Sequence, residues 1–154
     1  FGDSRRQCTC TPTQVNRYRS RISGPLLDRI DIQVEVSNVD YEDLSSTENS
    51  ETSAEIKKRV NKTRKLQLER YKDYNIYSNS QLDAGMLKKF CPLGEEENAI
   101  LRAAFDNLGL SARAHSRILK VARTIADLEG SENIKSEHIA EAIQYRSLDR
   151  KYFE

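Results

Sequence analysis

The chain has 154 residues, of which 37% are hydrophobic and 32% are charged, and its 25 Lys and Arg nearly balance its 24 Asp and Glu. This length suits one ordinary domain with a single hydrophobic core. No apolar run approaches the roughly 18 residues of a membrane-spanning helix, and the start shows no secretion signal. With no Trp and only 3 Pro, the composition predicts a charge-rich, mainly helical protein of the cytoplasm, with no membrane partner.

The residue inventory also indicates a piece of a larger protein. The only methionine is Met86, so we expect that Phe1 is not a natural translation start and that an N-terminal part precedes it. Three cysteines, Cys8, Cys10 and Cys91, are an odd number and too few for a disulfide scaffold. Without a secretion signal, a reducing compartment is expected.

Residues 1–44 are predicted to be the C-terminal end of an α/β core. Thr11-Pro12 suits a helix start, because Thr can cap and Pro fits the first turn, so we expect a short basic helix over 12–21. Ser23-Gly24-Pro25 then breaks it. Residues 30–36 alternate between apolar and polar side chains, which predicts a strand. A lone strand leaves its edges unpaired, so its partners are expected upstream of this chain.

Residues 45–79 are predicted to be a linker and a connecting helix. Residues 45–53 are polar, with no hydrophobic side chain between Leu44 and Ala54, which is typical of a flexible loop. The helix that follows is charged and has only a thin apolar stripe. Its stretch 56–73 carries eight Lys and Arg against two acids, a pattern that favours either a solvated face or a surface for nucleic acid.

Residues 80–154 are predicted to form a compact helical bundle. Helices are expected over about 80–90, 95–108, 111–129 and from 136 to about 146. The third is the most regular, with apolar residues at i, i+3, i+4 and i+7 spacing, a capping Ser111 and a terminating Gly130.

The chemistry that the chain could carry is limited. It has no phosphate-binding loop of the form GxxxxGK[ST] and no strand-borne acidic pair for Mg²⁺, so these residues alone are not expected to bind and hydrolyse ATP. His115 and His138 fall in separate predicted helices without metal-ligand spacing. Two arginines, Arg29 and Arg113, and the Cys8-x-Cys10 pair remain as candidates.

The two arginines occupy positions that can matter for phosphates. Arg29 stands just before the predicted strand, where its side chain would project from the rim of a sheet; a surface ion pair with Asp28 or Asp31 is the ordinary alternative. Leu26 and Leu27 are expected to anchor this turn inward. Arg113 lies in the first turn of a helix, where free N–H groups attract anions; an ordinary surface arginine is the alternative.

Three blocks of the sequence resemble the magnesium-chelatase-like AAA+ proteins, specifically their ComM (YifB) branch. The first joins Cys8-Thr9-Cys10 to RISGPLLDRID at residues 21–31. The second joins LSAR at residues 110–113 to RILKVARTIADL at residues 117–128, and the third is IAEAIQYR at residues 139–146. The blocks stand in the family's order and span nearly the whole chain.

The resemblance implies a fold, an activity and partners. The fold would be mainly α: a helical lid (80–154) that follows a linker and connecting helix (45–79) and a remnant of the α/β core with one helix and one strand (1–44). The complete protein would use ATP and Mg²⁺ in a homo-oligomeric ring that drives DNA branch migration during competence or recombination. Its partners would be its own N-terminal part, neighbouring subunits and DNA.

The resemblance also assigns roles to the candidate residues. Arg29 would be the arginine finger that reaches the γ-phosphate in the neighbouring subunit's site. Arg113 would be the sensor-2 arginine, which contacts nucleotide bound by its own subunit. Cys8 and Cys10 would be half of a four-cysteine Zn²⁺ site whose other half precedes this chain, so weak or no metal binding is expected here.

Two other functions stay open. The motor subunit of magnesium chelatase shares the finger and the lid, although the Cys-x-Cys and the RISGPLL phrase favour the ComM branch. A non-enzymatic helical module that binds DNA or acts as an adaptor is supported by the basic stretch 56–73.

Overall fold

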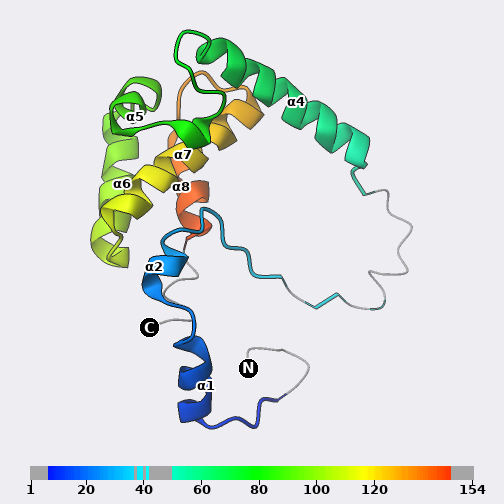
Figure 1. Cartoon of the computed structure of the whole chain (residues 1–154), viewed down its shortest axis with the longest axis vertical. Coiled ribbons are helices and arrows are strands. Elements are labelled where there is room, and N and C mark those ends of the chain that lie inside the picture. Colours follow the sequence, from blue (N-terminus) through cyan, green and yellow to red (C-terminus); the bar gives the residue numbers. More distant parts are fainter. Residues whose placement is uncertain (1–6, 37, 40, 42–49, 147–154) are drawn as a thin grey trace.

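The computed structural model describes residues 7–36, 38, 39, 41 and 50–146. Over this part the chain is mainly α, as the sequence predicts, and contains no strand. Its elements are α1 (Pro12–Arg19), α2 (Gly24–Leu27), α4 (Ser53–Arg70), the 3-10 helix η1 (Asn79–Gln81), α5 (Ala84–Phe90), α6 (Glu95–Leu108), α7 (Ala112–Glu129) and α8 (Ser136–Gln144) (Figure 1). No helix in the described ranges is both long and apolar enough to cross a membrane.

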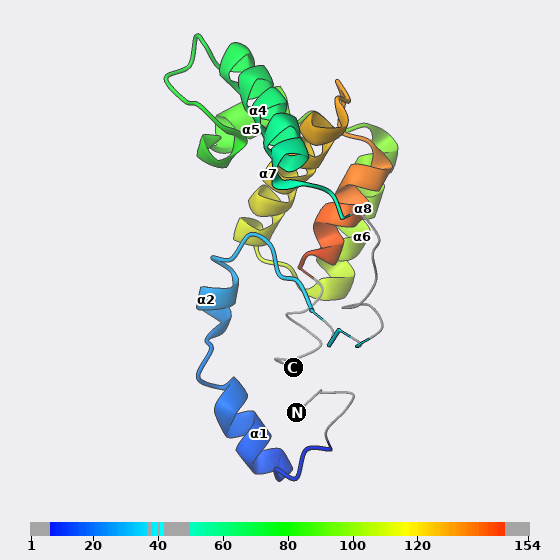
Figure 2. The same cartoon turned by 90° about the vertical axis from the view of Figure 1, so that its right-hand side faces the viewer.

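The hydrophobic core lies where α7 crosses the other helices of the bundle. α7 packs against α8, and α8 packs against α6, while α4, η1 and α5 contact α7 from its other side (Figures 1 and 2). The face of α7 that points into the core repeats at helical spacing and includes Ala114, Ile118, Ala122 and Ala126. Small residues at three of these four positions leave room for the neighbouring helices.

The end of α6 and both ends of α7 are set by residues that the sequence indicates. The helix predicted over about 80–90 is instead divided into η1 and α5, and α5 begins only at Ala84, after its cap Asp83. Ser111 accepts a hydrogen bond from the Ala114 N–H at 3.1 Å and starts α7. Gly109 and Gly130 end α6 and α7 in the left-handed conformation, with φ of 56° and 83°. A side chain at either glycine would be strained, because L-residues rarely adopt positive φ. The predicted boundaries of both helices are therefore confirmed.

A buried carboxylate connects α4, η1 and α7. Asp127 on α7 has a fully buried side chain. It accepts a hydrogen bond from each terminal guanidinium nitrogen of Arg70, at the end of α4, with N–O distances of 2.8 and 2.6 Å. Arg123, one turn earlier on α7, donates to it at 3.0 Å. The amides of Gln67 and Asn79 donate to the same carboxylate at 3.2 and 2.9 Å. A buried charge needs such partners, since it is otherwise very costly.

The buried polar cluster extends to the loop after α7 and to the aromatic residues after α4. Arg123 also donates to the carbonyls of Ser131 and Glu132, at 2.7 and 2.9 Å, and so fixes the loop between α7 and α8. Tyr71 donates its hydroxyl proton to Asn79 at 2.6 Å, and burial raises the pKa of this phenol, which keeps it a donor. The cluster therefore ties helices that are distant in sequence into one unit.

The strand predicted over residues 30–36 does not form. The segment is extended, but it pairs with no other strand in the described part of the chain. Its backbone instead follows the bundle, and the Gln33 N–H donates to the Tyr145 carbonyl at 2.9 Å. Alternation of side chains is necessary for a strand but not sufficient, because a ladder requires a partner backbone.

The turn after α1 also differs in detail from the prediction. α1 ends at Arg19, two residues before the expected end, and has no buried residue. The predicted break at Ser23-Gly24-Pro25 instead starts the short helix α2, with Pro in its first turn. Leu27 is buried as expected, whereas Leu26 is 47% exposed, so only one of the two leucines anchors this turn. α1 extends away from the bundle (Figures 1 and 2).

Replacing the central carboxylate should be among the most destabilising changes in the bundle. Asp127→Ala leaves the buried Arg123 and the partly buried Arg70 without their counter-charge, and we expect a loss of about 3–5 kcal/mol in the free energy of unfolding. Urea denaturation followed by circular dichroism measures this. The matched control is Asp106→Ala on the exposed face of α6, expected within about 0.5 kcal/mol of the parent. Equal effects of the two substitutions would contradict the assigned role of Asp127.

Candidate functional site

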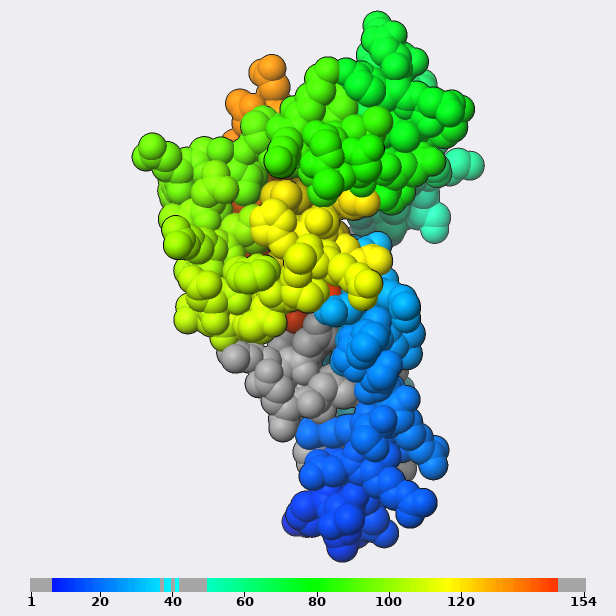
Figure 3. All heavy atoms as spheres, turned by 60° about the vertical axis from the view of Figure 1, so that its left-hand side comes forward, coloured from blue at the N-terminus to red at the C-terminus, as the bar shows by residue number. Residues whose placement is uncertain are grey.

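A cleft of about 1060 Å³ runs along α7, between this helix and the segment that follows α2. Asp31, Ile32 and Val34 line one side of it, and Tyr145 at the end of α8 lines another part. Figure 3 shows α7 (yellow) at the surface beside this segment (light blue). The volume is slightly above the usual range of about 300–1,000 Å³ for small-molecule sites, so size alone does not exclude a nucleotide.

Three basic side chains of α7 line the cleft: Arg113, Arg117 and Lys120. Their spacing of four and three residues places them on one face of the helix. Arg117 forms an ion pair with Asp31, and Lys120 donates to the Ser80 carbonyl at 2.8 Å. Arg113 is exposed and makes no hydrogen bond or ion pair with another described residue. It is therefore the basic group of the cleft that is available to a ligand.

The start of α7 favours negative charge. Its first turn contains no acidic residue, and Ser111 satisfies the N–H of Ala114. The preceding N–H groups of the helix have no acceptor within the helix, as at any N-terminus, and the helix dipole adds partial positive charge there. Arg113 lies in this turn, so backbone and side chain both favour an anion such as a phosphate.

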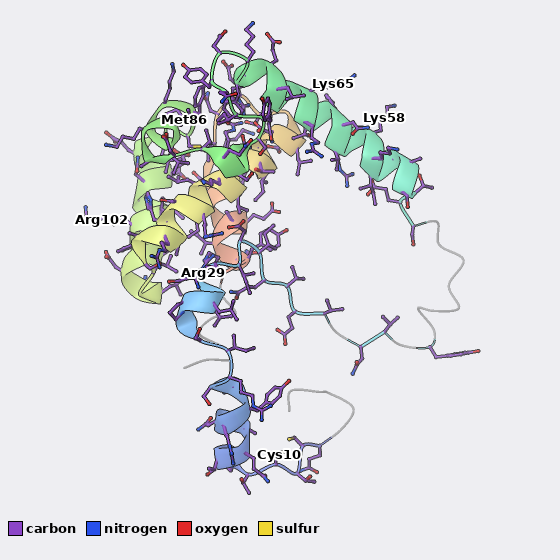
Figure 4. All side chains as sticks on the ribbon, in the orientation of Figure 1. Cys10, Arg29, Lys58, Lys65, Met86 and Arg102 are labelled. Carbon is purple, nitrogen blue, oxygen red and sulfur yellow. The ribbon has the colours of Figure 1, made fainter. Side chains whose placement is uncertain are left out.

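Arg29 lies directly after α2, next to the bundle and exposed to solvent (Figure 4). Its side chain does not form an ion pair with either flanking acid, Asp28 or Asp31, which was the alternative. Asp28 lies 3.6 Å from the guanidinium of Arg146, and Asp31 pairs with Arg117. In the described ranges, Arg29 itself has no ion pair or side-chain hydrogen bond. Its charge is thus exposed at the surface, with no counter-charge among the residues that the structure describes.

Cys8 and Cys10 precede α1 and do not line the cleft, and Cys10 lies at the far end of α1 from the bundle (Figure 4). A hydrogen bond from the Cys10 backbone is the main reason why the pKa of the Cys8 thiol is lowered, while the neighbouring Cys8 raises the pKa of Cys10. No third His, Cys, Asp or Glu of the described residues comes close enough to complete a metal site with this pair. A structural zinc takes four ligands, so these two thiols alone do not fit one.

A second group of potential ligands does come together, but hydrogen bonds occupy both ring nitrogens of its histidine. Glu129, Glu137 and His138 have ligand atoms within 4.8 Å of one another. The Lys135 N–H donates to His138 Nδ1 at 2.9 Å, which requires a lone pair there and a proton on Nε2. That proton is directed to Glu129 at 2.5 Å, and this bond lowers the pKa of Glu129. His138 therefore caps α8 and leaves no lone pair for a cation.

Sequence reasoning missed three groups at this site. Arg117 and Lys120 could have been found, because both lie within two turns of Arg113 on a helix whose start was predicted. Arg146 could not: its guanidinium donates to the carbonyl of Ile30 at 2.7 Å, across 116 positions of sequence. A contact between such distant segments has no local pattern.

The three thiols should differ sharply in reactivity. Burial raises the pKa of Cys91 to about 11, so at pH 8 it is almost entirely protonated as well as inaccessible. Cys8, with its lowered pKa, should be alkylated first and Cys10 more slowly. Timed iodoacetamide labelling with mass spectrometry tests this order, and unfolding in urea should expose Cys91. Labelling of Cys91 in the native protein at the rate of Cys8 would contradict the structure.

Comparison with known proteins assigns both parts of the chain to one family. The family description "Magnesium chelatase, subunit ChlI C-terminal" matches residues 50–146, which include the helical bundle. The description "Magnesium chelatase, subunit ChlI" matches residues 1–44.

Curated relatives give the same result over most of the chain. It is 43% identical over 141 residues to the competence protein ComM of Haemophilus influenzae, and 42% identical over 142 residues to the protein YifB of Escherichia coli. A Mycobacterium tuberculosis protein is 29% identical over 139 residues. These alignments cover 90–92% of this chain but only 27% of each relative, so the relatives are much longer. The chain belongs to the magnesium chelatase family, and its bundle is that family's C-terminal helical domain.

Proposed function

We propose that this chain is the C-terminal part of a ring-forming AAA+ ATPase of the ComM type, in which it supplies two arginines to ATP hydrolysis. The observation that carries the proposal is that Arg29 and Arg113 are exposed and have no ion pair among the described residues, although other arginines around them are paired. ATP and Mg²⁺ would be held mainly by the upstream part of the protein, since the phosphate-binding loop and its acidic partner are not in this sequence.

Arg113 is proposed to act as the sensor-2 residue of its own subunit. It lines the cleft and lies in the first turn of a helix whose N-terminus favours anions. Arg117 and Lys120 are already engaged with Asp31 and Ser80, which leaves Arg113 as the group to contact a phosphate oxygen. The planar guanidinium fork matches phosphate geometry better than a lysine would.

Arg29 is proposed to act in trans, as the arginine finger of the neighbouring subunit's site. Phosphoryl transfer develops negative charge on the γ-phosphate, and a guanidinium can stabilise that charge. A finger must project from its own subunit without a counter-charge, and the exposed position after α2 meets this requirement. The flanking acids cannot neutralise it as placed, because arginines of the bundle hold both.

DNA is proposed as the polymer on which the motor acts. The support is the similarity to a protein named for competence and the charge of α4, on which exposed Lys58 and Lys65 point away from the bundle (Figure 4). Backbone phosphates are the expected contacts of such lysines. The motor subunit of magnesium chelatase remains the alternative within the same family, supported by the two family matches.

Removing the Arg113 side chain should weaken the nucleotide response and leave the fold intact. In the full-length protein, Arg113→Ala is expected to raise the KM for ATP or lower turnover at least several-fold. Its melting temperature should stay within about 2 °C, because an exposed residue without partners contributes under about 0.5 kcal/mol. The matched control is Arg102→Ala, an exposed arginine of α6 outside the cleft (Figure 4), which should leave ATP kinetics unchanged. A large drop in melting temperature with normal turnover would make Arg113 structural.

Arg29→Ala should nearly abolish turnover in the assembled protein while leaving ATP affinity unchanged. Known arginine fingers contribute a factor of roughly 10³–10⁵ in rate, and they act on the transition state. Steady-state ATPase assays and binding of a fluorescent ATP analogue separate the two effects. Rings that mix Arg29→Ala subunits with subunits lacking the upstream phosphate-binding lysine should recover activity, since some interfaces then pair an intact loop with an intact finger. Unaltered turnover of Arg29→Ala rings would refute the assignment.

A further inference from the structure

The residues on both sides of Arg29 contact charged side chains of the bundle. Arg146 follows α8, and its side chain is only 1% exposed. Its guanidinium donates to the Ile30 carbonyl at 2.7 Å and lies 3.6 Å from the carboxylate of Asp28. Arg146 therefore contacts the residue before Arg29 and the residue after it.

Two further contacts extend this fastening along the chain. Arg117 of α7 forms an ion pair with Asp31, two residues after Arg29. The Gln33 N–H donates to the Tyr145 carbonyl at 2.9 Å, next to Arg146 in sequence. α7 and the two residues that directly follow α8 thus hold the segment that carries Arg29.

The short helix α2 cannot fix Arg29 without such support. It has only four residues, and Leu27 is its single buried side chain. Residues 30–36 have no ladder of strand hydrogen bonds to stiffen them. A group that must meet a phosphate within a fraction of an ångström needs supporting contacts of this kind.

We infer that Arg146 and Arg117 are positioning residues for Arg29, holding it in the orientation that a neighbouring subunit's nucleotide requires. This inference rests on the proposed function, because it presupposes that Arg29 is a finger. The two residues act through Arg29 and its backbone: Arg146 through the Ile30 carbonyl and Asp28, and Arg117 through Asp31.

A consequence is that one helix serves two nucleotide sites. Arg113 and Arg117 lie one turn apart on α7; the first faces the cleft of its own subunit, and the second holds the segment of the finger. A shift of α7 when nucleotide binds in the cleft would therefore move the support of Arg29. This gives a direct physical route from one subunit's nucleotide to its neighbour's rate of hydrolysis.

The first experiment is a double-mutant cycle in the full-length protein at the exposed ion pair. Asp31→Asn and Arg117→Gln should each lower kcat about 10- to 100-fold, the effect expected of a misplacement near 1 Å. Both residues also line the cleft, so ATP affinity is measured separately and the loss in kcat must remain at saturating ATP. The double variant should be no slower than the slower single variant, because both changes break one contact. Additive losses, or kcat values equal to the parent, would overturn the inference. Arg102→Ala is the control for a lost surface arginine.

The second experiment separates positioning from structural stabilisation by using mixed rings. In the first mixture, Arg146→Gln subunits are combined with subunits that lack the phosphate-binding lysine but keep a normal finger. An active site then consists of ATP bound by an Arg146→Gln subunit and Arg29 from its normal-finger neighbour. Activity should recover, because the altered Arg146 does not support the finger that is used. In the reverse mixture, Arg29→Ala subunits bind ATP, and the only finger comes from subunits that carry both Arg146→Gln and the lysine change. Activity there should be about 10- to 100-fold lower than with a normal finger.

The outcomes distinguish the possible failures. Loss of activity in both mixtures would mean that Arg146 serves only the fold, and recovery in both would mean that it does not position the finger; either result overturns the inference. If Arg146→Gln does not fold, the cycle at Asp31 and Arg117 decides alone. If Arg29→Ala rings are fully active, Arg29 is not a finger, and the proposed function is refuted together with the inference that rests on it. If they are inactive while all positioning variants are normal, only the inference fails.

Discussion

The carboxylate of Asp127 is the interaction on which the arrangement of this domain depends. It is fully buried, and four side chains from α4, η1 and α7 donate hydrogen bonds to it. Hydrophobic packing alone would let α4 slide along α7, since α4 buries only Thr63 and Gln67. A buried charge with directional donors has one favourable geometry, so it specifies register as well as contact. Arg123 extends this order to the loop before α8. The cluster therefore holds α4 and η1 on α7 and fixes the loop that leads to α8.

α7 is the helix through which fold and function are joined. Its inner face forms the core, its C-terminal half carries Asp127, and its N-terminal half lines the cleft with three basic side chains. Arg113 has no partner among the described residues, Arg117 holds the segment after α2 through Asp31, and Lys120 donates a hydrogen bond to η1. Charged side chains near Arg29 and Arg113 have partners, whereas those two arginines have none in the described part of the chain. This contrast is the physical reason to expect that they meet a charged ligand which the chain itself does not supply.

The sequence predicts the bundle well, because the signals there are local. Helical spacing, Ser111 as a cap and the glycines after α6 and α7 place the helix ends, and each signal acts within a few residues. The strand over 30–36 is a wrong prediction, since a strand is a property of two backbones and no partner lies in the described chain. The roles of Arg29 and Arg113 came from a family resemblance, and no local pattern reveals that Asp28 and Asp31 are held by Arg146 and Arg117. Such contacts depend on tertiary packing, and Asp127 could not be told from a surface aspartate for the same reason.

The most direct test of the account is a structure of the full-length assembly with a slowly hydrolysed ATP analogue and Mg²⁺. Each nucleotide is expected to lie at an interface between subunits. Arg113 should then be within hydrogen-bonding distance of a phosphate oxygen bound by its own subunit, and Arg29 of the adjacent subunit should face the γ-phosphate. The contacts from Arg146 and Arg117 to the segment around Arg29 should persist there. Nucleotide bound far from both arginines, or Arg29 contacting nucleotide of its own subunit, would contradict the account.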